Sequence, residues 1–284
     1  MTISVLVPSS LVREAEDKRE ATRKVGYVAR AATVFRADRL VVFPDEDGET
    51  RWGGGFVSTV LEYATTPPYL RKEAWGHRSE LEYAGILPPL RASPQTGSES
   101  DGSGSLRQGI VTEVGPDRRV RVNCGLQHPI SLVAPPDMAV PDEGERVTVR
   151  VSSRRPVRAR LVDEPIGGLV VERTDLQTAL DRPDAGLRIA TSRHGEELTV
   201  GRLANLTGQI QRDGMTVVFG SPGRGLPEIL GIDVAQLATR HEDATEPNAG
   251  GFDLWLNSIP HQGSKVVRTE EALFATLACL TLNE

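Results

Sequence analysis

Short apolar runs separated by helical patterns characterise the beginning of the chain. Residues 2–7 and 39–43 are almost continuously apolar, as strands covered on both faces of a parallel sheet are. Between them, Val25, Val28 and Ala32 recur at helical spacing. The pattern therefore predicts a strand, a helix and a second strand of the parallel type.

The same alternation of strands and helices returns in the last 120 or so residues. The predicted strands are 168–172, 187–192, 215–220 and 252–257, and the predicted helices are 201–210, 226–232 and one from Thr269 onward. Ser9 or Ser10 can cap the first helix of the chain, and Thr269 the last, because their hydroxyls accept hydrogen bonds from free amides. We therefore expect an α/β fold with a parallel sheet.

In the middle of the chain the period of the pattern changes to two. Apolar residues alternate with polar ones, mostly arginines, at 119–124, 146–151 and 157–161, which predicts short, half-buried strands. The arginines expected to point outward are Arg119, Arg121, Arg146, Arg150, Arg158 and Arg160. We interpret this region as an inserted β-barrel module that interrupts the α/β fold.

Composition marks the edges of the inserted module. Residues 92–105 are rich in Ser and Gly and show no periodicity, which is typical of a flexible linker. The predicted organisation is a first α/β part, a linker, an inserted domain and a second α/β part, at 1–91, 92–105, 106–162 and 163–284.

Charge separates the module from the rest of the chain. The 284 residues carry a net charge of −6, yet 106–160 hold 10 basic and 6 acidic side chains. The acidic total argues against a general polyanion binder, whereas the basic module predicts contact with a nucleic-acid backbone. A merely solvated arginine face is the alternative. Because 106–160 contain no Phe, Trp or Tyr, we expect contacts to phosphates and not stacking on bases.

Other features narrow the class of protein. No apolar run approaches the ~18 residues that a membrane span needs, and residues 1–8 lack the pattern of a signal peptide. Cys124 and Cys279 are too few and too far apart for a disulfide framework, which favours a cytoplasmic protein. A lysine-poor, acidic chain is typical of a high-GC or salt-adapted organism.

Three polar loops follow predicted strands, at 191–195, 220–225 and 257–268. Since ligands of parallel sheets bind beyond the carboxyl ends of strands, we expect these loops to form a binding site. The loop at 220–225 lacks the lysine and hydroxyl of a P-loop, and no GxGxxG opens the first helix. Cys124 and His128 alone do not make a zinc site, so no metal is predicted. A nucleoside-type cofactor pocket remains.

Several segments together resemble a SPOUT-class RNA methyltransferase family of archaea and eukaryotes that carries an inserted OB-like domain. These segments are 257–264 with 267–272, 191–195 with 218–220, 26–32 and 83–90. They extend over essentially the whole chain and include the position of the insertion. The sequence departs from the family pattern at 221–225 and at Lys265, where arginine is expected and lysine loses bidentate geometry.

The resemblance implies an α/β knot, in which the C-terminal helix threads a loop, with S-adenosylmethionine bound in the knot. It also implies a homodimer that brings the N-terminal helix of one subunit near the cofactor of the other. The implied cofactor-binding residues are Thr191, Gly220, Asn257, Gln262, Gly263, Ser264, Val267, Thr269 and Ala272.

Arg30 resembles the arginine that the ribose-methylating branch of this class places near its RNA acceptor. We therefore expect Arg30 to be the catalytic cation that orients and stabilises the acceptor, and Arg19 and Arg23, in the same helical stripe, to contact RNA. An ordinary surface arginine is the alternative for this position.

The expected activity is methylation of RNA by S-adenosylmethionine, at N3 of a uridine in ribosomal RNA. A uridine N3 carries a proton that must leave, so a base or a nearby cation is required. Methylation of a ribose 2′-hydroxyl is one alternative. A non-catalytic RNA-binding or assembly factor with a vestigial pocket is another, since the arginine face would serve either role.

Overall fold

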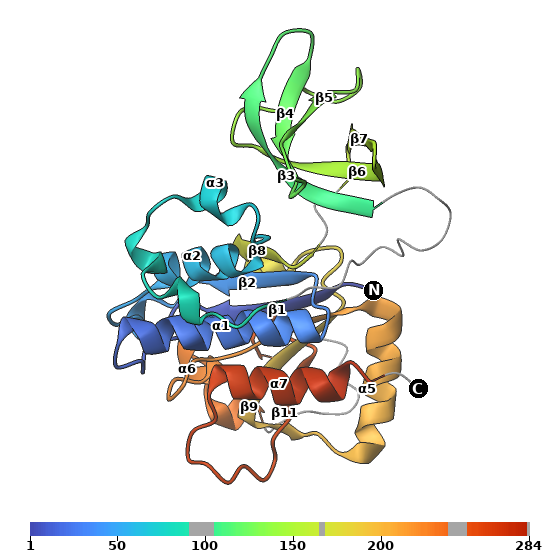
Figure 1. The fold of residues 1–284 in the computed structure, drawn as a ribbon. Helices are drawn as coiled ribbons and strands as arrows, with labels where there is room; N and C mark the ends of the chain where they lie inside the picture. Colours follow the sequence, from blue (N-terminus) through green and yellow to red (C-terminus); the bar gives the residue numbers. More distant parts are fainter. Residues whose placement is uncertain (91–104, 165–167, 238–248, 283–284) are drawn as a thin grey trace. The chain divides into compact units, whose positions relative to one another are not determined.

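The computed structural model describes residues 1–90, 105–164, 168–237 and 249–282 (Figure 1). The chain divides into two compact units. The first, which we call the α/β unit, comprises residues 1–65, 80–90 and 169–284; the second, the barrel unit, comprises 66–79 and 91–168. The predicted linker at 92–105 lies, except for Ser105, outside the described residues.

The α/β unit is built on a six-stranded sheet in the order β11-β9-β10-β1-β2-β8. Every neighbouring pair in it is parallel. The strands are β1 (Ile3–Pro8), β2 (Arg39–Phe43), β8 (Val170–Arg173), β9 (Leu187–Glu197), β10 (Met215–Val218) and β11 (Leu254–Asn257). The predicted α/β fold with a parallel sheet is thus confirmed.

Helices cover both faces of this sheet, because alternate strand residues point to opposite sides. Val5 and Val7 pack with α1, α2, α5 and α7 on one side, and Leu6 packs with α4 and α6 on the other. Figure 1 shows α1 and α7 side by side. The helices are α1 (Lys18–Val34), α2 (Gly54–Thr65), α4 (Leu176–Leu180), α5 (Val200–Asp213), α6 (Leu226–Ile229) and α7 (Thr269–Leu280). Short 3-10 helices span Glu46–Gly48, Ser79–Leu81, Ala84–Ile86, Val234–Leu237 and Ala249–Gly251.

The cap predicted for the first helix is wrong. Asp17 is the N-cap of α1, and its carboxylate accepts a hydrogen bond from the Glu20 amide at 2.7 Å. Ser9 and Ser10 lie eight or more residues before the helix, directly after β1. The helix predicted at 226–232 ends at Ile229, and the one predicted at 201–210 extends over Val200–Asp213.

The barrel unit contains a five-stranded antiparallel sheet in the order β5-β4-β3-β6-β7, which curls into a nearly closed barrel. Its strands are β3 (Ser105–Val114), β4 (Arg119–Asn123), β5 (Ile130–Val133), β6 (Arg146–Arg154) and β7 (Val157–Val162). Val122, Cys124 and Val149 are fully buried in its core, as the alternation predicts. The unit also includes α3 (Arg71–Trp75), which the predicted boundaries place in the first α/β part.

Within the described ranges, no helix is long and apolar enough to cross a membrane. Both cysteines are free, with Cys124 buried and Cys279 half-buried.

The packing of α7 against the sheet generates a stability prediction. Leu277 is fully buried in the core that α7 shares with α1 and α5. Leu277→Ala should lower the free energy of unfolding by about 2–5 kcal/mol, because it removes apolar contacts and leaves a cavity. Urea unfolding measures the change. Val200→Ala is the control, since Val200 is 89% exposed and its substitution should have little effect.

Candidate functional site

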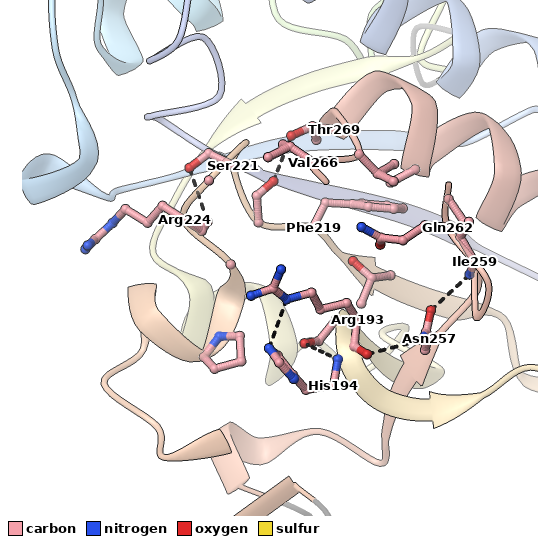
Figure 2. Close-up of a pocket in the computed structure, with 18 of the residues that line it drawn as sticks. Arg193, His194, Phe219, Ser221, Arg224, Asn257, Ile259, Gln262, Val266 and Thr269 are labelled. Atoms are coloured by element: carbon pink, nitrogen blue, oxygen red, sulfur yellow. Dashed lines mark hydrogen bonds between the residues drawn. The ribbon is translucent and has the colours of Figure 1, made fainter. Parts of the chain in front are cut away.

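A cavity of about 510 Å³ lies at the carboxyl ends of β9, β10 and β11, the size of a small-ligand site (Figure 2). Its walls come mainly from the three predicted loops, with further residues from α6, α7, the adjoining strand residues and Val234. The lining residues are Thr191, Ser192, Arg193, His194, Phe219, Gly220, Ser221, Gly223, Arg224, Gly225, Pro227, Glu228, Val234, Leu256, Asn257, Ser258, Ile259, Gln262, Lys265, Val266, Val267, Thr269 and Ala272.

The first wall of the cavity is formed at residues 191–195, which interrupt strand β9 and do not follow it as a loop. β11 pairs Trp255 with Ala190, but its next residue, Leu256, pairs with Glu196. The five residues 191–195 therefore leave the ladder between two paired positions, and the first four of them line the cavity. Gly195 makes this possible, because a Cβ there would lie 2.7 Å from the Trp255 carbonyl carbon.

Hydrogen bonds join the walls to one another. The Asn257 side chain donates to the Arg193 carbonyl and accepts from the Ile259 amide, both at 3.1 Å. The Thr191 hydroxyl donates to the Val218 carbonyl at 2.9 Å. Side chains that line the cavity are thus fixed by backbone groups of neighbouring strands.

The predicted capping role of Thr269 is wrong. Arg268 is the N-cap of α7, and its amide donates to the Glu271 carboxylate at 2.9 Å. The buried Thr269 hydroxyl instead donates to the Gly220 carbonyl at 2.8 Å, which ties the start of α7 to the loop after β10. Gly220 is itself closely packed, since a Cβ there would lie 2.8 Å from the Leu226 nitrogen.

The structure brings most of the predicted cofactor residues together. Thr191, Gly220, Asn257, Gln262, Val267, Thr269 and Ala272 line the cavity. Gly263 and Ser264 belong to the same loop but are exposed and do not line it. The Gln262 side-chain amide donates to the Ser264 carbonyl at 2.8 Å, so Ser264 still contributes to the shape of the loop.

Arg193 and His194 carry the polar chemistry of the first wall. The His194 Nε2 accepts a hydrogen bond from the Arg193 Nε at 3.0 Å, and the two side chains lie together in Figure 2. Partial burial, and then the Arg193 charge, lower the pKa of His194 from its usual value. The imidazole is therefore neutral near pH 7. In the described part of the chain, no cluster of three or more His, Cys, Asp or Glu residues could hold a metal ion.

Sequence reasoning missed a polar network beside the cavity. Ser10, Asp45, Ser221 and Arg224 come from the ends of three strands and contact one another. Hydrogen bonds that the Arg224 guanidinium donates to the Asp45 carboxylate raise the pKa of Arg224 above its usual value. The local signal for Ser10, Asp45 and Ser221 was a position within three residues of the end of a buried strand, and Arg224 lies farther along the last of these loops.

The two N-terminal motif segments contact each other. Arg30, on α1, donates through Nη1 to the carbonyls of Pro89 at 3.1 Å and Leu90 at 2.7 Å. One turn earlier, a Cβ on Gly26 would lie 2.6 Å from the Pro88 ring, so the glycine allows this close approach. Arg30 is half-buried, whereas Arg19 and Arg23 on the same helix are exposed.

The barrel arginines do not form one uniform outward face. Arg119, Arg121, Arg158 and Arg160 are exposed. The prediction that Arg150 points outward is wrong, because its side chain is only 19% exposed and forms a salt bridge with Glu164. The same prediction is wrong for Arg146, which is half-buried and whose Nη2 donates to the Thr66 hydroxyl at 2.6 Å.

The barrel unit also has aromatic rings that residues 106–160 lack. Tyr69 packs against Gly125, where a Cβ would lie 2.7 Å from the ring, and its hydroxyl donates to the Gln108 carbonyl at 3.0 Å. The Arg107 guanidinium lies 5.7 Å from the centre of this ring. The Arg78 guanidinium lies 5.3 Å from the centre of the Trp75 ring. The folded unit therefore contains rings from 66–79, and the expectation of phosphate contacts without stacking stays a prediction for 106–160.

Comparison with known proteins defines the class of the molecule. Residues 2–280 match the model of a family described as "Putative RNA methyltransferase". The chain belongs to this family, and the protein is an RNA methyltransferase.

Individual relatives agree with this assignment. The chain is 69% identical over its whole length to an uncharacterised protein of Halobacterium salinarum, and 67% identical to one of Haloarcula marismortui, with both chains fully covered. It is 27% identical to the human protein named 28S rRNA (uridine-N(3))-methyltransferase, over 98% of this chain and 77% of the human one.

The interruption in β9 generates a second prediction. Gly195→Ala should lower the free energy of unfolding by about 1–3 kcal/mol, because the added methyl group overlaps the backbone of β11. Urea unfolding checks this value. Gly201→Ala is the matched control: a Cβ there meets no atom within 4 Å, and alanine favours the helix that contains it. Equal stability of Gly195→Ala and the wild type would contradict the packing argument.

Proposed function

We propose that this RNA methyltransferase transfers a methyl group from S-adenosylmethionine to N3 of a uridine in ribosomal RNA. The observation that carries the proposal is the convergence of residues from 191, 220, 257 and 269 on one cavity. The name of the human relative, and the same name in mouse and Drosophila, supports uridine N3 as the acceptor.

The cavity fits the chemistry of S-adenosylmethionine. Ile259, Val266 and Val267 supply apolar surface of the kind that a nucleobase and its ribose bury against. Arg193 and Lys265 supply cations for the carboxylate of the amino-acid part. The tightly packed Gly220 lets the backbone pass where a side chain would fill the space. When bound, the cofactor supplies an electrophilic methyl group.

We propose that Arg30 stabilises the uridine that accepts the methyl group. Loss of the N3 proton leaves negative charge on the uracil ring, and a fixed guanidinium stabilises that charge better than a mobile one. The carbonyls of Pro89 and Leu90 hold the Arg30 guanidinium in a defined position. In the proposed homodimer, α1 of one subunit brings this arginine to the cofactor of the other.

Finer features of the architecture belong to the same proposal. A C-terminal knot in the α/β unit is part of the proposal, and the hydrogen bond from Thr269 to Gly220 holds the start of α7 beside the loop after β10. The strand order β5-β4-β3-β6-β7 supports an OB-like fold for the inserted barrel. We retain the domain boundaries at 106 and 162, with Thr66–Ser79 as an added part of the barrel unit, and a cytoplasmic location.

Arg30 generates a test of the chemistry. Arg30→Ala should reduce single-turnover methylation by about 10²- to 10³-fold, because it removes a charge that acts on the transition state. Binding of S-adenosylmethionine, measured by calorimetry, should stay unchanged. Arg30→Lys keeps the charge but loses the paired carbonyl contacts, so its rate should be intermediate. An unchanged rate in Arg30→Ala would show that the assignment is wrong.

The exposed barrel arginines generate a test of RNA binding. The double variant Arg158→Ala/Arg160→Ala should weaken RNA binding and reduce the slope of log affinity against log salt by about 2, one unit per lost phosphate contact. Filter binding over a range of KCl concentrations measures the slope. Arg212→Ala, which removes an exposed arginine of α5, is the control and should leave the slope unchanged.

Mass spectrometry of ribosomal RNA nucleosides from a strain that lacks the gene tests the proposed product. Loss of 3-methyluridine supports the proposal. Loss of a 2′-O-methylated nucleoside would favour the ribose acceptor, and no loss at all would favour an RNA-binding factor without activity.

A further inference from the structure

A buried carboxylate from a distant part of the sequence lies beside the cavity. Asp45 follows β2 and is only 6% exposed. Both of its oxygens accept hydrogen bonds from Arg224, with Nε at 3.2 Å from each and Nη2 at 3.0 Å from Oδ1. Its Oδ2 also accepts from the Ser10 hydroxyl, and its amide donates to the Ser9 hydroxyl at 2.8 Å. The carboxylate is therefore fully paired.

Its partner Arg224 closes a tight turn that forms part of the cavity wall. The Ser221 amide donates to the Arg224 carbonyl at 3.0 Å, and the Arg224 amide donates back to the Ser221 carbonyl at 3.1 Å. The Ser10 and Ser221 hydroxyls lie 2.8 Å apart. Residues at the ends of β1 and β2 thus contact both ends of the turn 221–224.

The Asp45 carboxylate is also closely packed against Gly48. A Cβ on Gly48 would lie 2.1 Å from the Asp45 Oδ2 and 2.8 Å from the Ser10 Cβ. Only glycine at this position leaves room for the observed carboxylate. The local backbone is therefore built around the position of Asp45.

The turn is held from two sides by different interactions. On one side the Thr269 hydroxyl contacts the Gly220 carbonyl, and on the other the Asp45–Arg224 salt bridge holds residue 224. The side chains of Asp45 and Arg224 are 3% and 15% exposed, so salt screens this pair far less than a surface pair. Removing Arg224 would leave the buried Asp45 carboxylate without its opposite charge, whereas removing Asp45 would leave Arg224 paired with the exposed Glu228 at 3.0 Å and without its buried partner.

We infer that Asp45, together with Ser10, is a positioning residue that fixes the wall formed by 221–224 and thereby sets the affinity for the methyl donor. Asp45 does not line the cavity itself, so it acts through Arg224 and Ser221, which do. The inference rests on the proposed function, since it assumes that the cavity binds S-adenosylmethionine.

Asp45→Asn in the full-length chain tests this inference. The dissociation constant for S-adenosylmethionine, measured by calorimetry, should rise about tenfold or more, because the cavity wall loses its fixed position. The affinity for RNA and the rate at saturating cofactor should stay within about twofold of the wild type, since no group that touches RNA is changed.

Asp253→Asn is the matched control. Asp253 also makes a bidentate salt bridge, with Arg188 at 3.0 and 2.7 Å, but that pair lies at the start of β9 and not beside the cavity. This variant should lose stability without a change in cofactor affinity. Equal effects of both variants on cofactor affinity would show that Asp45 acts only through general stability, and would overturn the inference.

Gly48→Ala is a second variant in case Asp45→Asn does not fold. It keeps every charge but displaces the carboxylate, so cofactor affinity should fall in the same direction. Wild-type affinity in a folded Asp45→Asn or Gly48→Ala variant would contradict the inference alone. A wild-type protein that binds no S-adenosylmethionine at millimolar concentration would overturn the proposed function and the inference together.

Discussion

The parallel direction of the six strands is the constraint on which the site depends. Every strand of the α/β unit ends at the same edge of the sheet, so loops far apart in the sequence meet there. β9, β10 and β11 contribute the walls of the cavity, and β1 and β2 contribute the residues behind one wall. A single antiparallel strand among these five would send its loop to the opposite edge. Strand direction thus matters more for the site than any one side chain.

The parallel sheet also explains which parts of the fold and of the site could be predicted from the sequence. Buried parallel strands leave a strong local signal, because both of their faces must be apolar. The three candidate loops were predicted from the ends of those strands, and each contributes to the cavity, although 191–195 interrupts β9 and does not follow it. The alternating pattern of the barrel was equally clear, since Val120 and Val122 point inward and Arg119 and Arg121 outward. The two α/β parts and the intervening barrel were therefore visible in the chain itself.

Contacts between residues far apart in the sequence account for the features that the sequence did not predict. Ser10 looked like a helix cap because nothing nearby indicates a partner 35 residues away in Asp45 and another 211 residues away in Ser221. Arg150 looked like its exposed neighbours because its pairing with Glu164 depends on how the chain continues after β7. Tyr69 and Trp75 lie before the alternating region, so composition of that region could not reveal rings in the barrel unit. In each case the property belongs to the folded chain.

The interruption in β9 has a consequence for how the cavity receives a ligand. Ladder pairs at Ala190 and Glu196 anchor both ends of the segment 191–195, and the Asn257 side chain holds its Arg193 carbonyl. A segment anchored in this way has little conformational entropy left to lose. Binding therefore does not have to order this wall, and most of the free energy of its contacts can appear as affinity. The strand supplies in advance the rigidity that many enzymes obtain only when a lid closes.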